Sequence, residues 1–245
     1  MNVEKITNWL DATLSVASFD DVSNNGIQIS SSGKDVNTVA FAVDASVRAV
    51  EAAAAFGAEM LVVHHGISWG GGIKRIDGGI YRVIKAAMDA DIALYACHLP
   101  LDAHPTLGNN ARLVKNLSLT KSEEAFKYRS SKIGFVGKAT KRTQKALDLL
   151  CADAGIKSVK VAPGELVGVC SGGAGDFAEE AKNLGCSLYI TGEADWGSVI
   201  VAENCSMKML CLGHYATEVW GVRALSGAMA KSLRVKTVDL TEDLA

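Results

Sequence analysis

The histidines of this chain gather in three short segments, and each segment follows an apolar run that is typical of a buried β-strand. The segments are residues 61–66, 94–104 and 209–218, and their histidines are His64, His65, His98, His104 and His214. Two carboxylates, Asp102 and Glu218, lie in the same segments. Imidazoles and carboxylates are ligands that Zn, Fe, Mn and Ni accept, and strand ends are where an α/β fold collects polar residues. The pattern therefore predicts a metal site.

The spacing within the segments limits how the side chains can converge. Adjacent residues of a regular strand point to opposite faces, so His64 and His65 would hold different ions. A break in the strand at Gly66 would instead let them splay around a shared bridging ligand. His214 and Glu218 have i, i+4 spacing at a predicted helix start, which places them on one face with the carboxylate near the positive end of the helix.

Pro100 separates His98 from Asp102 and predicts a loop between them rather than a helical turn. His104 lies beyond that loop, and we expect it to support the local structure rather than to bind metal. If two ions bind, each would have two or three protein ligands, and coordination positions would remain for water. Open coordination positions are typical of a catalytic metal site rather than a structural one.

The composition favours a globular protein without a membrane or nucleic-acid partner. The chain has 245 residues, of which 49% are hydrophobic, so it can bury a substantial core. It has neither a signal-like leader nor a run of 18 apolar residues, so we expect a cytoplasmic location. The net charge of −2 predicts no nucleic-acid surface. Six cysteines without a C-x-x-C pair are predicted to be reduced and buried.

Strand-like and helix-like segments alternate along the chain, which predicts mainly parallel sheets covered by helices. The predicted strands are residues 39–43, 60–63, 92–96, 134–137, 166–170, 187–191, 207–212 and 236–240. The predicted helices are residues 46–56, 81–90, 143–154 and 176–184, and a last helix from about residue 217 or 219 to 233.

The second half of the chain repeats the first. Residues 43–65 align without gaps on residues 171–193, and the His-x-x-x-carboxylate element at His98 returns at His214. An internal duplication would give an α/β protein of two similar three-layer lobes, residues 1–125 and 126–245, which could exchange terminal elements. The metal site would then lie in the cleft between the lobes. Chance similarity of two βαβ units is the alternative interpretation.

Five ordered motifs carry a resemblance to a known family. They are Asn25-Gly26-Ile27-Gln28, His64-His65-Gly66, His98-Leu99-Pro100-Leu101-Asp102, Thr191-Gly192-Glu193 and Gly213-His214-Tyr215-Ala216-Thr217-Glu218. Together they resemble the NIF-three-like family, whose members are also labelled GTP cyclohydrolase I type 2 homologues, in its minimal form without an insertion between the lobes. The resemblance implies a two-lobed α/β fold, a dinuclear metal centre and assembly into a toroidal homohexamer.

The resemblance also implies roles for individual residues. Two divalent ions per chain, which could be Zn, Fe, Mn or Ni, would be held by His64, His65, Asp102, His214 and Glu218. Glu218 would bridge the ions, and His98 would be a catalytic residue or would orient a ligand. Gly66 stands where many members have proline, which predicts a looser loop after the paired histidines.

The predicted activity is metal-dependent hydrolysis of a small molecule. A metal-bound hydroxide would attack a nucleotide-like or cyclic amide substrate, and His98 would shuttle the proton. Gly70-Gly71-Gly72 lacks the Lys-Ser or Lys-Thr of a phosphate-binding P-loop. The alternative is a non-enzymatic hexameric adaptor or metal-handling protein, and turnover would distinguish the two.

Overall fold

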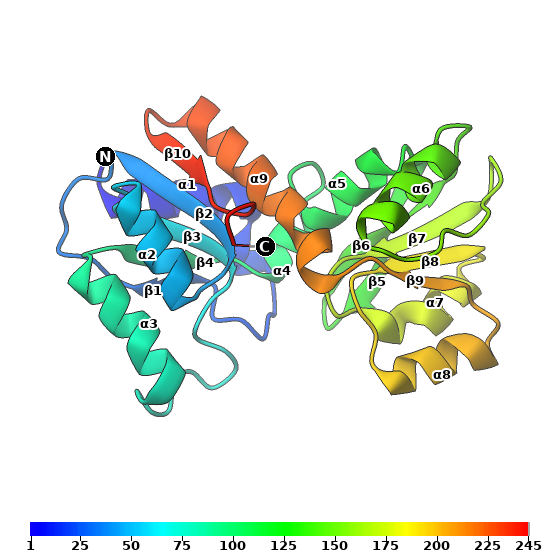
Figure 1. Cartoon of the computed structure of the whole chain (residues 1–245), viewed down its shortest axis with the longest axis horizontal. Coiled ribbons are helices and arrows are strands. Elements are labelled where there is room, and N and C mark those ends of the chain that lie inside the picture. Colours follow the sequence, from blue (N-terminus) through cyan, green and yellow to red (C-terminus); the bar gives the residue numbers. More distant parts are fainter. Residues whose placement is uncertain (245) are drawn as a thin grey trace. The chain divides into compact units, whose positions relative to one another are not determined.

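The computed structural model describes residues 1–244, which form two compact units (Figure 1). The first unit is Met1–Leu101 together with the chain from Val222 onward, and the second is Asp102–Gly221. This division differs from the predicted boundary after residue 125. Two pairings account for the difference: β10 (Lys236–Asp239) pairs with β2 (Thr38–Asp44), and β5 (Thr120–Tyr128) pairs with β6 (Ser131–Lys138).

The first unit contains a five-stranded sheet with the order β1-β4-β3-β2-β10 among the described residues. Its remaining strands are β1 (Gly26–Ile29), β3 (Met60–His65) and β4 (Ala93–Ala96). Only the β1–β4 pair is antiparallel within this sheet, so it is the mainly parallel sheet that the sequence predicts. The helices α1 (Val3–Leu14), η1 (Val16–Ser18), α2 (Val47–Ala55) and α3 (Gly78–Asp89) belong to the same unit.

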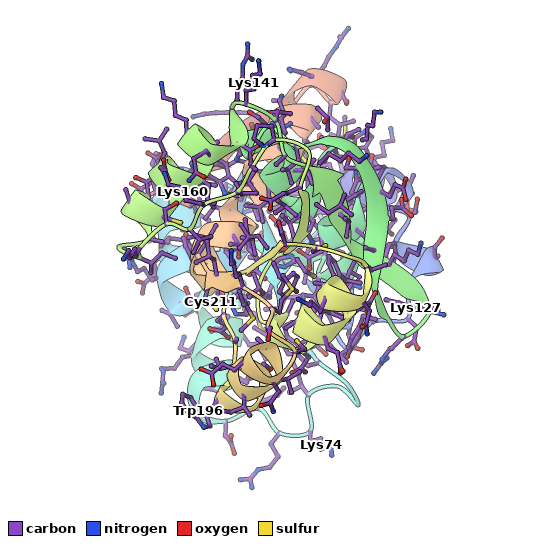
Figure 2. The ribbon with its side chains drawn as sticks, turned by 90° about the vertical axis from the view of Figure 1, so that its right-hand side faces the viewer. Lys74, Lys127, Lys141, Lys160, Trp196 and Cys211 are labelled. Atoms are coloured by element: carbon purple, nitrogen blue, oxygen red, sulfur yellow. The ribbon has the colours of Figure 1, made fainter. Side chains whose placement is uncertain are left out.

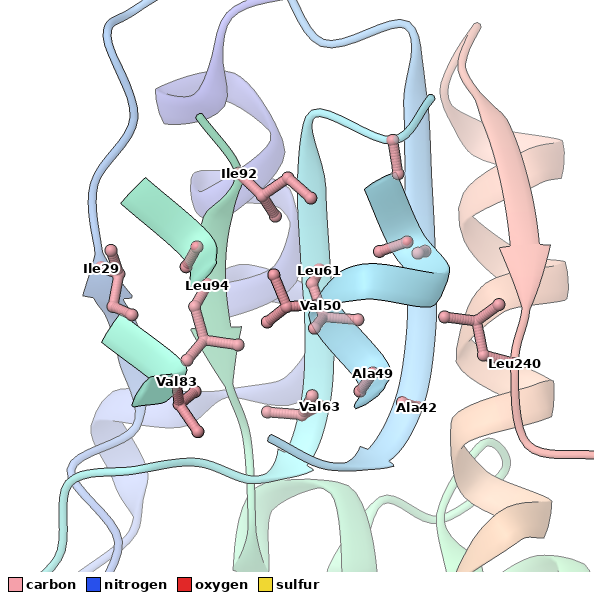
Figure 3. Packing of buried hydrophobic residues seen from close by; sticks show 14 of the residues in the cluster. Ile29, Ala42, Ala49, Val50, Leu61, Val63, Val83, Ile92, Leu94 and Leu240 are labelled. Atoms are coloured by element: carbon pink, nitrogen blue, oxygen red, sulfur yellow. The ribbon is translucent and has the colours of Figure 1, made fainter. Parts of the chain in front are cut away.

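Successive side chains of a strand point to opposite faces of the sheet, and this alternation determines which residues form the core of the first unit. Leu61 and Val63 of β3 point to the face covered by α2 and α3, where they pack with Val50 and Val83 (Figure 3). On the opposite face, the Tyr95 hydroxyl donates a 2.7 Å hydrogen bond to Asp11 of α1. Each fully buried Leu or Val contributes about 1.5–3 kcal/mol to folding. Both faces of the sheet are therefore covered, and polar residues are left to the strand ends.

The second unit contains a five-stranded sheet with the order β5-β6-β7-β8-β9. Its remaining strands are β7 (Leu166–Cys170), β8 (Leu188–Thr191) and β9 (Met209–Cys211). The β7-β8-β9 part is parallel, as is the β2-β3-β4 part of the first sheet, which fits the predicted repeat. The β5–β6 and β6–β7 pairs are antiparallel, so the prediction of a mainly parallel sheet holds for the first unit only. Its helices are α5 (Asn109–Asn116), α6 (Thr143–Asp153), η2 (Gly175–Phe177), α7 (Ala178–Asn183) and α8 (Trp196–Asn204).

Two helices continue across the boundary between the units: the short α4 (Leu99–Ala103) and the long α9 (His214–Ser232). The prediction of a loop around Pro100 was wrong, because Pro100 occupies the first turn of α4. A first-turn residue needs no backbone N–H for an intrahelical hydrogen bond, so proline is tolerated there. The α9 helix begins at His214, three residues before its earliest predicted start.

The exposed lysines and four of the six cysteines lie as the composition predicts. Lys141, two residues before the start of α6, extends into solvent (Figure 2). Cys97, Cys151, Cys170 and Cys186 are buried thiols, and no disulfide occurs among the described residues. The prediction that all six cysteines are buried was wrong for Cys205 and Cys211, which are only partly buried. Within residues 1–244, no helix has both the length and the apolar character that a membrane span requires.

Candidate metal centre

Three histidines converge at one edge of the first sheet. The parallel strands β3 and β4 pair Val63 with Ala96, so His64, His65 and His98 all follow the paired region at the same edge. One ring nitrogen from each histidine lies within 4.8 Å of the other two, and the ring centroids are 4.5–5.7 Å apart. We predicted that His64 and His65 of a regular strand would point to opposite faces of the sheet. Their rings nevertheless lie close together, because His65 is the last residue of β3, where the regular strand ends.

Each of these rings is fixed by a hydrogen bond from its Nδ1 atom. His64 donates to the carbonyl oxygen of Cys97 at 3.0 Å. His65 donates to the Asp44 carboxylate at 2.8 Å, since β2 pairs Asp44 with His65 in register. His98 donates to Asp21 at 2.9 Å. Histidines that bind metal through one ring nitrogen donate the other N–H to a carbonyl or carboxylate in this way, which leaves Nε2 as the ligand atom.

Asp21 holds His98 through both of its carboxylate oxygens. Oδ1 accepts from the His98 ring, and Oδ2 accepts from the backbone N–H of Leu99 and from the Asn25 side chain at 2.9 Å each. Burial raises the pKa of Asp21, but the hydrogen bond and charge of His98, with the hydrogen bonds of Asn25 and Ser23, lower the pKa to about 2 overall. Asp21 is therefore ionised at neutral pH and accepts a hydrogen bond from the Nδ1–H group of His98.

Gln28 fixes the loop that follows the paired histidines. Its Oε1 accepts from the backbone N–H groups of Ile67 and Ser68, at 2.6 and 3.2 Å. A Cβ atom on Gly66 would lie 2.2 Å from this oxygen and 2.6 Å from the Ala96 Cβ. The expectation of a looser loop at Gly66 was wrong, because glycine allows the loop to pack closely against Gln28.

The second unit presents His214 and Glu218 from the first turns of α9. The His214 Nε2 atom lies 3.2 Å from Glu218 Oε1, and its Nδ1 lies 2.9 Å from Glu193 Oε1. The hydrogen bond to Glu218 is the main cause that raises the pKa of His214 to about 9, and Glu193 adds to it against the effect of burial. The two carboxylates thus favour a cation at this position, whether a proton or a metal ion.

Asp102 is positioned by two buried side chains of its own unit. Its Oδ1 accepts from Asn109 Nδ2 at 2.8 Å and from Ser171 Oγ at 3.1 Å. Asn109 also accepts the backbone N–H of Gly221 at 2.7 Å, one turn beyond Glu218 on α9. A ligand oxygen of Asp102 lies within 4.8 Å of one of Glu218. Asn109 therefore ties the Asp102 carboxylate to the helix that carries Glu218.

His104 has the supporting role that the sequence predicts. Its Nδ1 accepts backbone hydrogen bonds from Thr106 and Leu107, at 3.2 and 3.0 Å. In the other four histidines Nδ1 meets a carbonyl or carboxylate oxygen instead. His104 thus caps the turn after α4.

The donor groups suit a divalent metal ion. Within the first unit three imidazoles lie close together. Within the second unit there are one imidazole and the carboxylates of Asp102 and Glu218, which are only 6% and 2% exposed. Mixed nitrogen and oxygen ligands of this kind are accepted by Zn, Fe, Mn and Ni. The described residues therefore include groups that could hold a metal ion, as the sequence predicts.

Comparison with known proteins places this arrangement in a family. Residues 1–243 match the model of the Duf34/NIF3 family (NGG1p interacting factor 3). The chain belongs to this family. A protein of Pyrococcus horikoshii named "GTP cyclohydrolase 1 type 2 homolog" is 40% identical over 97% of both chains, and one of Archaeoglobus fulgidus with the same name is 39% identical over 98% of both. The resemblance stated from the five motifs is therefore confirmed.

Solved structures confirm the two-lobed α/β fold of this Duf34/NIF3 protein. A protein described as "protein ybgI, unknown function" superposes with a TM-score of 0.86 at 29% identity, covering 98% of this chain and 97% of that one. The structure titled "Reduced HcgD from Methanocaldococcus jannaschii" has a TM-score of 0.82 at 22% identity and covers 98% of both chains, and it supports the fold alone.

Several residues that orient the candidate ligands were not predicted as site residues. Asp44 could have been found, because it follows an apolar strand just as the histidines do. Glu193 lies in a motif of the resemblance, but no role was inferred for it. Asp21, Asn109 and Ser171 carry no local signal, since hydrogen bonds to residues distant in sequence give them their roles.

Proposed function

We propose that this Duf34/NIF3 protein is a metal-dependent hydrolase with a dinuclear centre. The proposed ligands of the two divalent ions are His64, His65, Asp102, His214 and Glu218, with Glu218 bridging the ions. The observation that carries the proposal is a hydrogen-bonding pattern shared by His64, His65, His98 and His214. In each of them Nδ1 meets a carbonyl or carboxylate oxygen, so Nε2 is the atom left for a ligand role. Zn, Fe, Mn and Ni all suit these ligands.

We further propose that the ligands of both units serve the same pair of ions. The chain itself supports this, because only three residues separate His98 from Asp102, which limits the distance between their Cα atoms to at most about 14 Å. Asp102 and Glu218 already present ligand oxygens within 4.8 Å of each other. Activity would then require residues from both units.

His98 is proposed as the residue that moves protons. The other histidines and the two carboxylates already supply five ligands, and the His98 ring is held by the ionised Asp21. With Nδ1–H donated to Asp21, its Nε2 can accept a proton from a water nucleophile and return it to a leaving group. The same geometry also suits His98 as a further ligand or as a residue that orients one, so the experiment must separate these roles.

When bound, the ions would supply a nucleophile from water near neutral pH and would polarise substrate oxygens. The protein would hold the ions through His64, His65, His214 and the two carboxylates, and it would orient Asp102 through Asn109. The names of the relatives support a nucleotide-like substrate, and a cyclic amide undergoes the same type of hydrolysis. We propose a toroidal homohexamer as the assembly, from the resemblance to the family.

Metal handling without turnover is the second candidate function. The observation that favours it is the exposure of His214, whose side chain is 36% accessible although it carries a proposed ligand atom. A ligand open to solvent allows an ion to be delivered or withdrawn. A hexameric adaptor or metal-handling protein would use the same residues without a catalytic role for His98.

The test combines metal content with turnover. The protein is reconstituted with Mn, Fe or Zn, and elemental analysis is expected to find close to two ions per chain. A panel of nucleotides and cyclic amides is then assayed, and His98→Ala is expected to retain metal while the rate falls by about 100-fold or more. Loss of metal in this variant would make His98 a ligand. Full metal loading without turnover on any substrate would favour the metal-handling function.

A further inference from the structure

Trp69 presents a fixed aromatic ring beside the three histidines of the first unit. The side chain follows the paired histidines by four residues and is 37% exposed. Its ring centroid lies 5.1 Å from that of His98 in an edge-on arrangement and 6.0 Å from that of His65. The indole Nε1 donates to the Gly66 carbonyl at 2.9 Å, so the ring cannot turn freely about its side-chain bonds.

The backbone around Trp69 is also held in place. Trp69 forms a β-bridge with Ser23, and the Gly70 N–H donates to the Val22 carbonyl at 2.6 Å. The Asn24 side chain donates to Ser68 Oγ at 2.7 Å, and the Asn24 N–H donates to the Ser68 carbonyl at 3.1 Å. Here the hydrogen bonds hold an open ring in a defined position.

A cavity of about 620 Å³ lies against this ring. Gly66, Ile67 and Trp69 form one part of its lining, and the first residues of α2 and α3 form the rest. Val47, Ile80 and Val83 make the lining largely apolar, while Ser46, Asp77 and Arg82 add polar groups. The volume is within the range of small-molecule sites, which is about 300–1,000 Å³. Apolar walls with a few polar groups are also typical of such sites.

We propose that this cavity binds a flat heteroaromatic ring, the part of the substrate that does not react, stacked on Trp69. An indole face accepts any such ring, because stacking needs only a π-face. Arg82 can donate to acceptor atoms of the ring, and Asp77, which is paired with Arg75 at 2.9 Å, can accept from its donors. This inference rests on the proposed hydrolase function only in treating the bound ring as part of a substrate.

The test is a binding titration by calorimetry with adenosine, guanosine, uridine and ribose. The nucleosides are expected to bind metal-free and metal-loaded protein alike, while ribose, which has no aromatic ring, does not bind. Trp69→Leu is expected to weaken nucleoside binding by about 10-fold or more, which is the usual effect of removing an aromatic side chain on which a base stacks. The matched control is Trp196→Leu, which alters a 76% exposed tryptophan at the start of α8 (Figure 2) and is expected to change nothing.

A second variant keeps the test decisive should Trp69→Leu fail to fold. Gly79 lines the cavity near the start of α3, and a Cβ atom there would meet nothing within 4 Å. Leucine also favours helix more than glycine does, so Gly79→Leu should fold while its side chain occupies part of the cavity. We expect it to weaken nucleoside binding with unchanged metal content.

The outcomes separate the cavity from the metal centre. Two ions per chain without nucleoside binding would overturn the cavity proposal and leave the hydrolase proposal standing. Nucleoside binding that depends on Trp69 in a protein that takes up no metal would support the cavity and refute the hydrolase. Binding that is equal in Trp69→Leu and the wild type, or equal for ribose and nucleosides, would overturn the stacking assignment.

Discussion

Gly172 leaves space for the carboxylate of Glu218, and the Gly172→Ala substitution is expected to fill that space. A Cβ atom at this position would lie 2.3 Å from Glu218 Oε1. The carboxylate would have to retreat by about 1.1 Å to reach the 3.4 Å of ordinary contact. Glu218 is only 2% exposed, so it has little free space in which to move. Metal ligands have to be held within about 0.5 Å of their productive positions.

The same substitution also strains the backbone, because Gly172 has a φ of +67°. A side chain in the left-handed region costs about 1–2 kcal/mol. Gly185→Ala is the matched control: its φ is +79°, and the nearest atom to the new Cβ would be 3.9 Å away. The control carries the backbone strain without the displacement of Glu218.

Both variants should lose about 1–2 kcal/mol of unfolding free energy in urea, measured without metal. Only Gly172→Ala should also lose metal affinity, by about 10–100-fold, the range seen when a group that orients a ligand is removed. Competition with a chromogenic chelator measures this affinity. Equal affinities for the two variants would refute the steric reasoning and the assignment of Glu218 as a ligand.

The remaining predictions concern Glu218, Asn109 and the assembly. Glu218→Gln should lower metal occupancy in elemental analysis more than His104→Ala does, because a bridging carboxylate serves both ions; equal losses would remove the bridging assignment. Asn109→Leu should lower the free energy of unfolding by about 1–3 kcal/mol, since it leaves the Gly221 N–H and the Asp102 carboxylate without their present partner, and an unchanged urea midpoint would contradict this. Light scattering should give about 154 kDa, six times the chain mass of 25.7 kDa. A monomeric mass would contradict the hexamer.

The sequence predicted the elements whose residues follow a regular pattern. The strand at residues 166–170 and the helix from Thr143 were placed almost to the residue, because apolar alternation and helical spacing reflect which face is buried. The same patterns marked where strands end, and so they located His64, His65, His98 and His214. Helices α1, α5 and α8 were not predicted, although α1 buries Ile6, Leu10 and Leu14 at helical spacing.

What the sequence could not provide was the set of contacts between distant residues. Asp21 meets His98 across a separation of 77 residues, and Ser171 meets Asp102 across 69. No local pattern encodes such a pair, because each partner is only one polar residue among many. The prediction of a loop at Pro100 was wrong for a different reason. A proline breaks the interior of a helix but not its first turn, and the sequence alone does not show which of these positions Pro100 occupies.

The fixed rings of His64, His65, His98 and His214 also bear on how quickly an ion could enter. A carbonyl or ionised carboxylate only accepts hydrogen bonds, so each Nδ1 keeps its proton and Nε2 is the atom left for a metal ion. His214, whose pKa is raised to about 9, must also release its Nε2 proton before an ion can bind there. No ring has to flip or exchange its Nδ1 proton during loading. The slow step then passes to the incoming ion, which must shed its own water. An ion that dehydrates reluctantly, as Mg²⁺ does, would be at a disadvantage in rate as well as in affinity.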